Sequence, residues 1–291
     1  MKVLTRERMV YSLCKTHPPA IEVGSGEILR VETYDARAGT IRSELDHLDC
    51  THFNPATGPI LVKDAQTDDS LTVEILEIDL SQEGFVAVKA QSGLLAHKAH
   101  SFVTRMVPVR EGKVIFSDHI KFPVRPMVGV IGTAPEGEGV NTDLMGPHGG
   151  NMDNRYVTDG ATVLLPVLAP GALLCLGDVH ATMGDGEISS LGLEICADVT
   201  IRVSVNKGVT ISRPWIETAT VWVTTGEAVD PIQALQMAAE EMTMLLQRQL
   251  GLTFEEAYML VSARGDVQIC QVCGPNTFPV TTRAVFPRVD V

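Results

Sequence analysis

Residues 71–78, Leu-Thr-Val-Glu-Ile-Leu-Glu-Ile, alternate apolar and polar side chains, with one interruption at Leu76. Because successive side chains of a strand point to opposite faces, this alternation predicts a β-strand with one buried face. Runs rich in valine, isoleucine and threonine recur on both sides of it, between glycine, proline and aspartate clusters. We expect further strands over residues 28–33, 60–63, 85–89, 102–109, 113–117, 127–131, 162–167, 195–205 and 219–224. Many strands at close spacing are typical of a β-sandwich or barrel.

Two helices are expected near the C-terminus. Asp230 followed by Pro231 is a typical helix start, apolar residues then recur on one face, and Gly251 can end the helix. Residues 253–256, Thr-Phe-Glu-Glu, form a capping box for a second helix that runs to about Ala263. The two helices followed by a strand over 267–272 predict a small α+β unit.

The charge and the apolar runs exclude some classes of partner. The chain has 291 residues, with 23 lysines and arginines against 36 aspartates and glutamates, a net charge of −13. This acidity opposes nonspecific binding to nucleic acid and to anionic membrane surfaces. No run of 18 apolar residues is present, and the first ten residues contain charges rather than the apolar core of a signal peptide. We therefore expect a cytoplasmic protein with no nucleic-acid or membrane partner.

The six cysteines are dispersed, which indicates a reducing compartment rather than a disulfide scaffold. Cys270-Gln-Val-Cys273 is a single CxxC motif inside an apolar run. Without a second CxxC pair, structural thiols are the favoured interpretation over zinc or redox chemistry.

Two segments in the middle of the chain concentrate chemistry-bearing residues, and the first is 146–155, Gly-Pro-His-Gly-Gly-Asn-Met-Asp-Asn-Arg. Gly149 and Gly150 allow positive φ and a close approach of the backbone to a ligand, which suits an oxyanion hole. His148, Asn151 and Asp153 surround this glycine pair. A tight turn capped by polar residues is the alternative interpretation.

The second segment is 177–187, Gly-Asp-Val-His-Ala-Thr-Met-Gly-Asp-Gly-Glu. Asp178 and His180 are two positions apart, so their side chains share one face of an extended segment. Asp185 and Glu187 repeat this spacing, and a turn through the intervening glycines can bring the two pairs together. Carboxylates with an imidazole suit zinc or a similar divalent ion, and an unligated carboxylate can act as a general base. A solvated turn with a hydrogen-bonded histidine is the alternative.

Taken together, these stretches resemble the acetamidase/formamidase family. Besides the two segments above, the matching pieces are 31–35 (Val-Glu-Thr-Tyr-Asp), 54–59 (Asn-Pro-Ala-Thr-Gly-Pro), 129–135 (Gly-Val-Ile-Gly-Thr-Ala-Pro) and 165–167 (Leu-Pro-Val). Three places depart from the family pattern and leave the substrate open. They are Met183, where a glutamine is expected, the run 189–194, and the acidic segment 136–141.

The resemblance implies a mainly β fold with three parts. A β-sandwich core with the catalytic loops would comprise residues 1–60 and 125–204, a small β-barrel-like insertion residues 61–124, and a C-terminal α+β subdomain residues 205–291. It further implies hydrolysis of short aliphatic amides such as formamide and acetamide to carboxylate and ammonia, in a homodimer or higher homo-oligomer.

We consider three mechanistic interpretations. In the first, zinc, with a second ion such as calcium as an option, is held by Asp178, His180 and Asp153, with His148 as an alternate ligand. Glu187 is the general base, with Asp185 and Glu32 in reserve, and Gly149, Gly150 and Asn151 hold the oxyanion. The second is a cysteine-dependent amidase that uses Cys50, which lies beside two histidines, or Cys175, which lies in an apolar run. The third is a metal- or ligand-binding β-sandwich that is not an enzyme.

Overall fold

The computed structural model describes residues 1–46, 52–274 and 278–289. Within these residues the strands form sheets of nine, seven, four and two strands. The nine-stranded sheet has the order β1 (Lys2–Leu4), β5 (Glu27–Thr33), β18 (Ala197–Asn206), β7 (Ser70–Leu80), β16 (Thr162–Pro166), β19 (Trp215–Glu217), β20 (Val221–Ala228), β22 (Val280–Pro287), β21 (Asp266–Gln271). The seven-stranded sheet has the order β14 (Met145–Gly146), β15 (Gly149–Asn151), β12 (Met127–Gly132), β17 (Leu174–His180), β6 (Ala56–Val62), β2 (Met9–Val10), with β4 (Ile21–Val23) also paired to β6. The prediction of a mainly β fold is confirmed.

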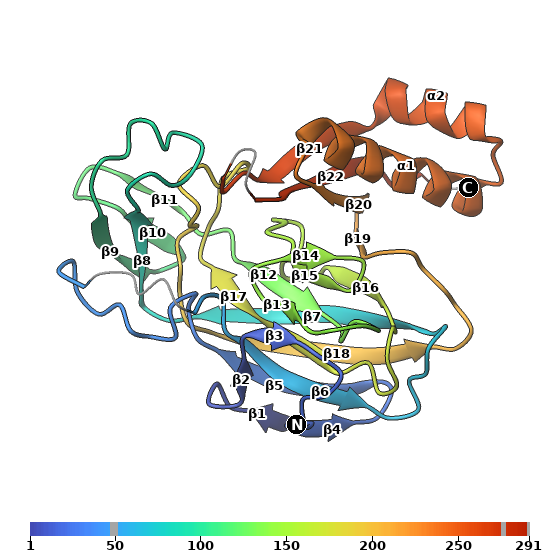
Figure 1. The fold of residues 1–291 in the computed structure, drawn as a ribbon, viewed down its shortest axis with the longest axis horizontal. Helices are drawn as coiled ribbons and strands as arrows, with labels where there is room; N and C mark the ends of the chain where they lie inside the picture. The colour runs from blue at the N-terminus through green and yellow to red at the C-terminus, as the bar shows by residue number, and fades with distance from the viewer. Residues whose placement is uncertain (47–51, 275–277, 290–291) are drawn as a thin grey trace.

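The main core lies between the seven-stranded sheet and the strands β5, β18 and β7 of the nine-stranded sheet, in the lower half of Figure 1. Val73 and Ile75 of β7 and Ile201 of β18 belong to the same buried cluster as Ile131 of β12 and Leu176 of β17. Every residue of β17 is buried. A strand that is covered on both faces loses the apolar–polar alternation of a half-exposed strand, which explains why β17 reads as a continuous apolar run before its polar end.

The small four-stranded sheet has the order β11 (Lys121–Pro123), β10 (Lys113–Ile115), β9 (Val103–Arg110), β8 (Glu83–Val88). Its end strands, β11 and β8, are not paired with each other, so the described residues form no closed barrel here. β7 falls within the expected insertion 61–124, but it lies in the middle of the nine-stranded sheet. The remaining short sheet pairs β13 (Val140–Asn141) with β3 (Ser12–Leu13). The division into three subdomains stays a prediction.

The two C-terminal helices begin and end as the sequence predicts. In α1 (Pro231–Leu250) Asp230 accepts a hydrogen bond from the Gln233 N–H, and Gly251 closes the helix in the left-handed conformation. Thr253 and Glu256 form the capping box of α2 (Phe254–Arg264). No helix among the described residues is both long enough and apolar enough to cross a membrane.

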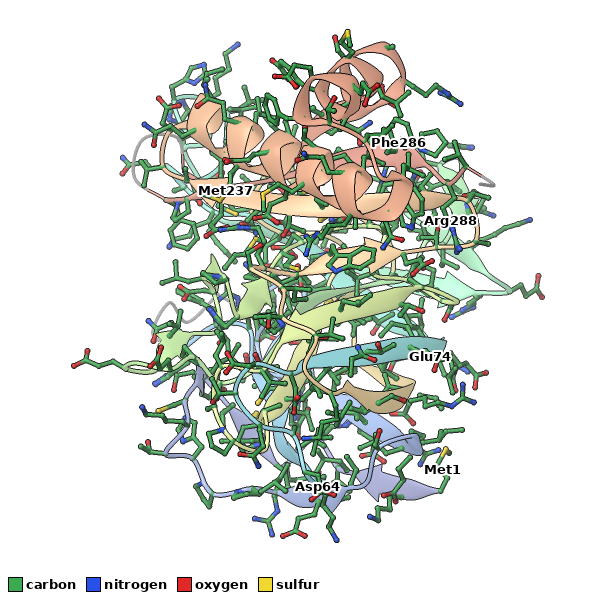
Figure 2. All side chains as sticks on the ribbon, turned by 90° about the vertical axis from the view of Figure 1, so that its right-hand side faces the viewer. Met1, Asp64, Glu74, Met237, Phe286 and Arg288 are labelled. Atoms are coloured by element: carbon green, nitrogen blue, oxygen red, sulfur yellow. The ribbon has the colours of Figure 1, made fainter. Side chains whose placement is uncertain are left out.

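The helices cover the C-terminal strands of the large sheet. Met242 and Leu246 of α1 pack with Trp222 of β20 and Phe286 of β22. Figure 2 shows Met237 and Phe286 in this C-terminal layer, while Met1 and Asp64 lie at the opposite end of the molecule. The strands β21 and β22 extend from under the helices toward the end of β17 (Figure 1). The C-terminal part of the chain therefore reaches the place where the polar residues of β17 lie.

Candidate active site

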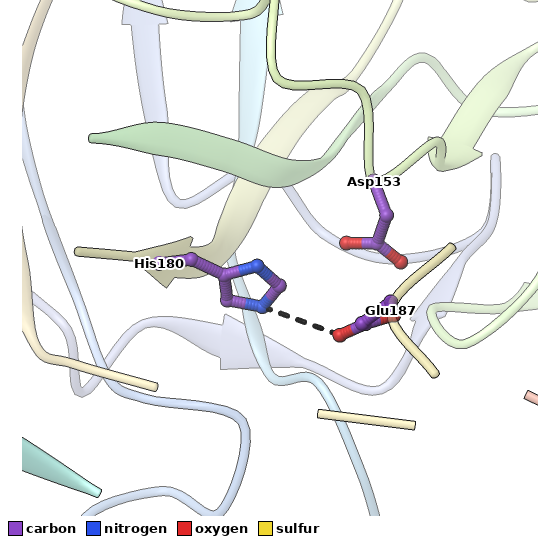
Figure 3. A group of neighbouring side chains, drawn as sticks. All are labelled: Asp153, His180 and Glu187. Atoms are coloured by element: carbon purple, nitrogen blue, oxygen red, sulfur yellow. Dashed lines mark ion pairs between the residues drawn. The ribbon is translucent and has the colours of Figure 1, made fainter. Parts of the chain in front are cut away.

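Four carboxylates and one imidazole gather at the C-terminal end of β17. Asp178 and His180 are on this strand, Asp153 follows β15, Glu187 lies in the loop after β17, and Glu194 ends that loop. All five side chains are buried. Figure 3 shows Asp153 and Glu187 on the side to which the His180 ring points. Three sequence-predicted ligands and the predicted base are thus brought together from positions up to 34 residues apart, as between Asp153 and Glu187.

The His180 ring is the centre of this cluster. Its Nε2 lies 3.1 Å from Glu194 Oε1, 3.6 Å from Asp178 Oδ1 and 3.9 Å from Glu187 Oε1. Despite these short distances, neither ring nitrogen has a hydrogen-bond partner of good geometry among the described residues. Three carboxylate oxygens and one imidazole nitrogen that lie close together without directed hydrogen bonds are a typical set of ligand atoms for a cation.

The backbone is strained where the carboxylates originate. Asp153 has φ 42°, Asp178 has φ 54° and Glu187 has φ 41°, all in the left-handed region that residues with a Cβ seldom adopt. Such conformations each cost roughly 1–3 kcal/mol and persist where the surrounding structure imposes them. Three strained residues in one cluster indicate that the orientation of these carboxylates serves a function.

Two glycines leave the space that the cluster occupies. A Cβ at Gly129 of β12 would lie 2.5 Å from Asp153 Oδ1 and 2.8 Å from the Asp178 carbonyl oxygen. A Cβ at Gly192 would lie 2.5 Å from His180 Nδ1. Any larger residue at either position would displace a member of the cluster, so these glycines are required by the side chains around them.

Burial and mutual repulsion shift the ionisation of the cluster. Burial raises the pKa of Asp153 well above its usual range, and the nearby Glu187 and Asp178 raise it further. Burial likewise raises the pKa of Glu187, and it raises the pKa of Glu194 to about 7. For His180, burial alone would lower the pKa, but the adjacent Glu194 and Asp178 raise it well above its usual value. Burial and neighbouring negative charge thus disfavour the ionised form of Asp153, Glu187 and Glu194, and a bound cation would offset this effect.

The residues present fit a divalent metal ion. Asp153 Oδ1, Asp178 Oδ1 and Glu194 Oε2 are buried without a hydrogen-bond partner among the described residues. An unsatisfied buried polar atom costs about 1–3 kcal/mol, and more if it is charged. Asp153, His180 and Glu187 form one group whose ligand atoms lie within 4.8 Å of one another, and Asp178, His180 and Glu194 form a second. Carboxylate oxygens with one imidazole nitrogen are ligands suited to zinc and related divalent ions.

A cavity of about 490 Å³ gives access to the cluster. Asp153, Asp178, Glu187 and Glu194 line it, together with Asn151, Asp143 and Gln271. The side-chain oxygens of Asn151 and Asp143 are buried and lack hydrogen-bond partners among the described residues. Arg37, Phe53, Lys89 and Phe278 are further lining residues. A small polar molecule inside this cavity would meet the carboxylates directly.

Sequence reasoning missed two members of the site, Glu194 and Gln271. Glu194 forms isolated backbone bridges to His180 and to Phe85 of the small sheet. Gln271, at the end of β21, donates hydrogen bonds from its side-chain nitrogen to Asp153 and Glu187. Each is a polar residue inside an otherwise apolar run, 193–197 and 269–273 respectively, and that interruption is the only signal the sequence offers.

Two reserve candidates for the base are engaged elsewhere. The Asp185 carboxylate lies 2.5 Å from Arg283 Nη2 and 3.1 Å from Arg155 Nη2. Glu32 lies on β5, with its carboxylate 3.8 Å from Arg6 and 3.6 Å from Arg30. Neither belongs to the carboxylate cluster or lines its cavity. Of the three predicted bases, only Glu187 is in place.

The predicted oxyanion-binding glycines also lie away from the cavity. Gly149 and Gly150 pair with Gly132 and Ile131 of β12, and neither they nor His148 are among the lining residues. A Cβ at Gly150 would lie 2.2 Å from the Leu144 carbonyl oxygen, so the close approach here is to neighbouring backbone. Burial lowers the pKa of His148 to about 4, which keeps it neutral. Of the predicted substrate-binding residues, the structure places only Asn151 on the cavity.

The cysteines are poor candidates for a nucleophile. Burial raises the pKa of Cys175 far above its usual value and that of Cys270 to about 12. Cys273 lines the cavity, with its Sγ 3.8 Å from Glu187 Oε2, but burial and this carboxylate raise its pKa strongly. A nucleophilic cysteine needs a lowered pKa, so these environments disfavour the thiolate. Cys50 lies outside the described residues.

The comparisons with known proteins identify the family of this chain. The sequence matches the Acetamidase/Formamidase family over residues 14–144 and 137–282. This chain belongs to the acetamidase/formamidase family. Crystal structures of acetamidase from Bacillus halodurans and of a predicted acetamidase/formamidase from Thermoanaerobacter tengcongensis are both 37% identical, with a TM-score of 0.94. These two matches cover 98% of this family member and 97% and 95% of the other chains.

The named relatives are more distant. A putative formamidase of Schizosaccharomyces pombe is 27% identical over 254 residues, and the match covers 65% of this chain. The formamidase of Methylophilus methylotrophus is 25% identical over 252 residues. The chain spans 62% of the length of each of these relatives. The gamma lactamase of Delftia acidovorans, 20% identical with a TM-score of 0.71, shares the fold.

Proposed function

We propose that this protein hydrolyses short aliphatic amides, formamide and acetamide among them, to a carboxylate and ammonia, and that the buried cluster holds a divalent metal ion for this reaction. The observation that carries the proposal is a group of four carboxylates that line a cavity and surround one imidazole. Several of their oxygen atoms and both imidazole nitrogens lack a hydrogen-bond partner among the described residues. Family relatives bearing the names formamidase and acetamidase support the substrate class.

His180, Asp178 and Glu194 are the residues to which we assign the metal, with Asp153 as a further ligand. When bound, a divalent ion such as zinc polarises a carbonyl group and lowers the pKa of water toward neutrality. His180 and Glu194 are each 1% exposed, which shields this end of the cluster from bulk water. A second ion, such as calcium, would have to be bound by carboxylates alone, because the two ligand groups share His180 and one imidazole nitrogen binds one ion.

Glu187 is the residue that we assign as general base. It lines the cavity and is slightly more exposed, at 6%, than the other carboxylates of the cluster. Burial raises its pKa, and a base whose pKa approaches neutrality can both accept and return a proton at neutral pH. In the proposed reaction, Glu187 takes a proton from the attacking water and delivers it to the nitrogen of the leaving ammonia.

Asn151 and Asp143 are the residues that we assign to substrate binding. Their unpaired side-chain oxygens line the same cavity as the carboxylates. A primary amide carries two N–H donors, and acceptors at these positions would bind them. A homo-oligomeric state, which the family resemblance implies, and a cytoplasmic location, which the dispersed cysteines favour, complete the proposal.

Activity should decline as the acyl chain of the substrate grows. We expect ammonia release from formamide, acetamide and propionamide, in falling order, because each methylene group changes the selectivity of a small pocket by about 1–3 kcal/mol. Steady-state assays of ammonia release at matched substrate concentrations measure this order. A preference for a bulky aromatic amide, or for the charged substrate asparagine, would refute the proposed substrate class.

A further inference from the structure

We propose that Gln271 is a positioning residue, whose side-chain amide orients two carboxylates, that of Asp153 as a metal ligand and that of Glu187 as the general base beside the metal ion. Through this residue, the C-terminal part of the chain completes the active site. The inference rests on the proposed metal-dependent function.

One nitrogen of Gln271 serves two carboxylates. Nε2 donates a hydrogen bond to Asp153 Oδ2 and a second, of 2.7 Å, to Glu187 Oε2. The second oxygen of each carboxylate is thereby left for the centre of the cluster. Asp153 Oδ1 has no hydrogen-bond partner among the described residues, and Glu187 Oε1 lies 3.9 Å from His180 Nε2. Each carboxylate is therefore fixed through one oxygen and presents the other.

The backbone holds Gln271 in register with the loop that carries Glu187. Along β21, Ile269 is opposite Thr282 while Gln271 is opposite Thr281, so one extra residue forms a bulge between them. Bulges are frequent beside active sites, where they redirect a side chain. The Gly186 N–H donates to the Cys270 carbonyl, and the Val272 N–H donates to the Gly186 carbonyl, each at 2.8 Å. These two hydrogen bonds fix the backbone of Gln271 beside Gly186, the residue that precedes Glu187.

The same loop is anchored to the C-terminal strands by an ion pair whose arginine is buried. Arg283 of β22 is fully buried and lies 2.5 Å from Asp185, two residues before Glu187. Its guanidinium also donates to the Gln268 side-chain oxygen at 2.6 Å. Arg283 thus links the loop that carries Glu187 to β21, the strand that carries Gln271, and this link restrains movement of Gln271 relative to Glu187.

A neutral donor suits this position better than a charged one. Gln271 is 4% exposed, so a lysine or arginine here would place a buried cation beside the two carboxylates and compete with the metal for their charge. A glutamine amide satisfies one oxygen of each carboxylate and leaves their negative charge in place. Outer hydrogen-bond partners of this kind typically change metal affinity or activity by about 10–100-fold.

The test compares Gln271→Met, which keeps the size and removes both donors, with the wild-type protein. Zn²⁺ affinity is measured by competition with a chromophoric chelator, and the visible absorption of the Co²⁺-substituted protein reports the ligand geometry. We expect the Kd for Zn²⁺ to rise by about 10–100-fold and the Co²⁺ spectrum to change. At saturating Zn²⁺, kcat for acetamide should fall about tenfold or more, with a smaller change in KM, because the side-chain nitrogen of Gln271 donates to the two carboxylates.

Gln236→Met provides the matched control, because Gln236 is exposed on α1 and should show wild-type affinity. If Gln271→Met does not fold, Gln271→Asn replaces it, since an amide one methylene shorter does not bridge both carboxylates. Wild-type Zn²⁺ affinity and an unchanged Co²⁺ spectrum in the folded variant would overturn the inference. The alternative outcome is that Zn²⁺ affinity depends on Gln271 but the wild-type protein releases no ammonia from any short amide. That result would overturn the proposed function and leave the positioning role supported.

Discussion

Replacement of His180 with alanine should yield a folded protein that no longer retains a divalent metal ion. The imidazole is the only nitrogen ligand in both candidate groups, and its loss leaves carboxylates without their shared partner. Metal affinity should fall by more than the roughly 10–100-fold typical of an outer partner, and ammonia release should fall to background. Elemental analysis of the purified protein, together with the assay on acetamide, measures both effects.

A thermal-unfolding series separates loss of metal from loss of fold. A ligand that binds only the folded state stabilises it by about 2.7 kcal/mol at 100 times its Kd. Added Zn²⁺ should therefore raise the Tm of the wild-type protein and of the exposed-surface control His119→Ala, but not that of His180→Ala. Unchanged metal content in His180→Ala would contradict the assignment of this cluster as the metal site.

The second large effect is expected at Glu187. Glu187→Gln keeps the size of the side chain and removes the proton acceptor, and general-base catalysis typically contributes about 10²–10⁴-fold to a rate. We expect kcat for acetamide to fall by at least about 10²-fold while the variant retains its metal ion. Parallel measurement of kcat and metal content is needed because Glu187 also belongs to one of the two candidate ligand groups.

The matched control for this change is Glu74→Gln, on the exposed pair between Glu74 and Arg202 of the large sheet. This variant should keep wild-type kcat and metal content. Loss of metal together with activity in Glu187→Gln would make Glu187 a ligand rather than the base. Turnover near the wild-type rate with metal bound would show that Glu187 is only a loop residue, and the proposed mechanism would be wrong at its central step.

The strands and helices that could be predicted from the sequence are those whose signals come from residues close together in the chain. The alternation at 71–78 predicts one buried face, and in β7 Val73 and Ile75 are buried while the interrupting Leu76 is 38% exposed. The caps at Asp230 and Thr253 predict both helices, because a capping side chain bonds to backbone within its own first turn. The pairing of β7 with β18 joins segments more than a hundred residues apart, and sequence pattern alone does not encode that separation.

The residues of the site also divide into those that local sequence spacing predicts and those that only tertiary pairing brings to the site. Asp178 and His180 share a strand, and Asp153 follows the glycine pair at 149–150, so local spacing is enough to predict these three residues. Glu194 reaches His180 only because the chain after the loop returns to pair with the end of β17. Gln271 arrives through the C-terminal hairpin and its bulge. The glycine pair at 149–150 does mark a close approach, but to the carbonyls of Leu144 and Ile131 rather than to a ligand.

A cysteine-dependent mechanism and a metal-dependent mechanism differ in their response to thiol-alkylating reagents and to chelators. A cysteine-dependent amidase would lose activity on thiol alkylation, with protection by substrate, and would survive a chelator. The raised pKa values of Cys175, Cys270 and Cys273 oppose that outcome for these three thiols. A binding protein that is not an enzyme would retain metal and release no ammonia from any short amide.

The most direct test is ammonia release from acetamide before chelation, after removal of metal to below one tenth of an ion per chain, and after readdition of Zn²⁺. We predict that activity disappears with the metal and returns with Zn²⁺, because the proposed reaction depends on a cation bound by His180 and the carboxylates around it. Full activity in the verified metal-free protein would contradict the central claim.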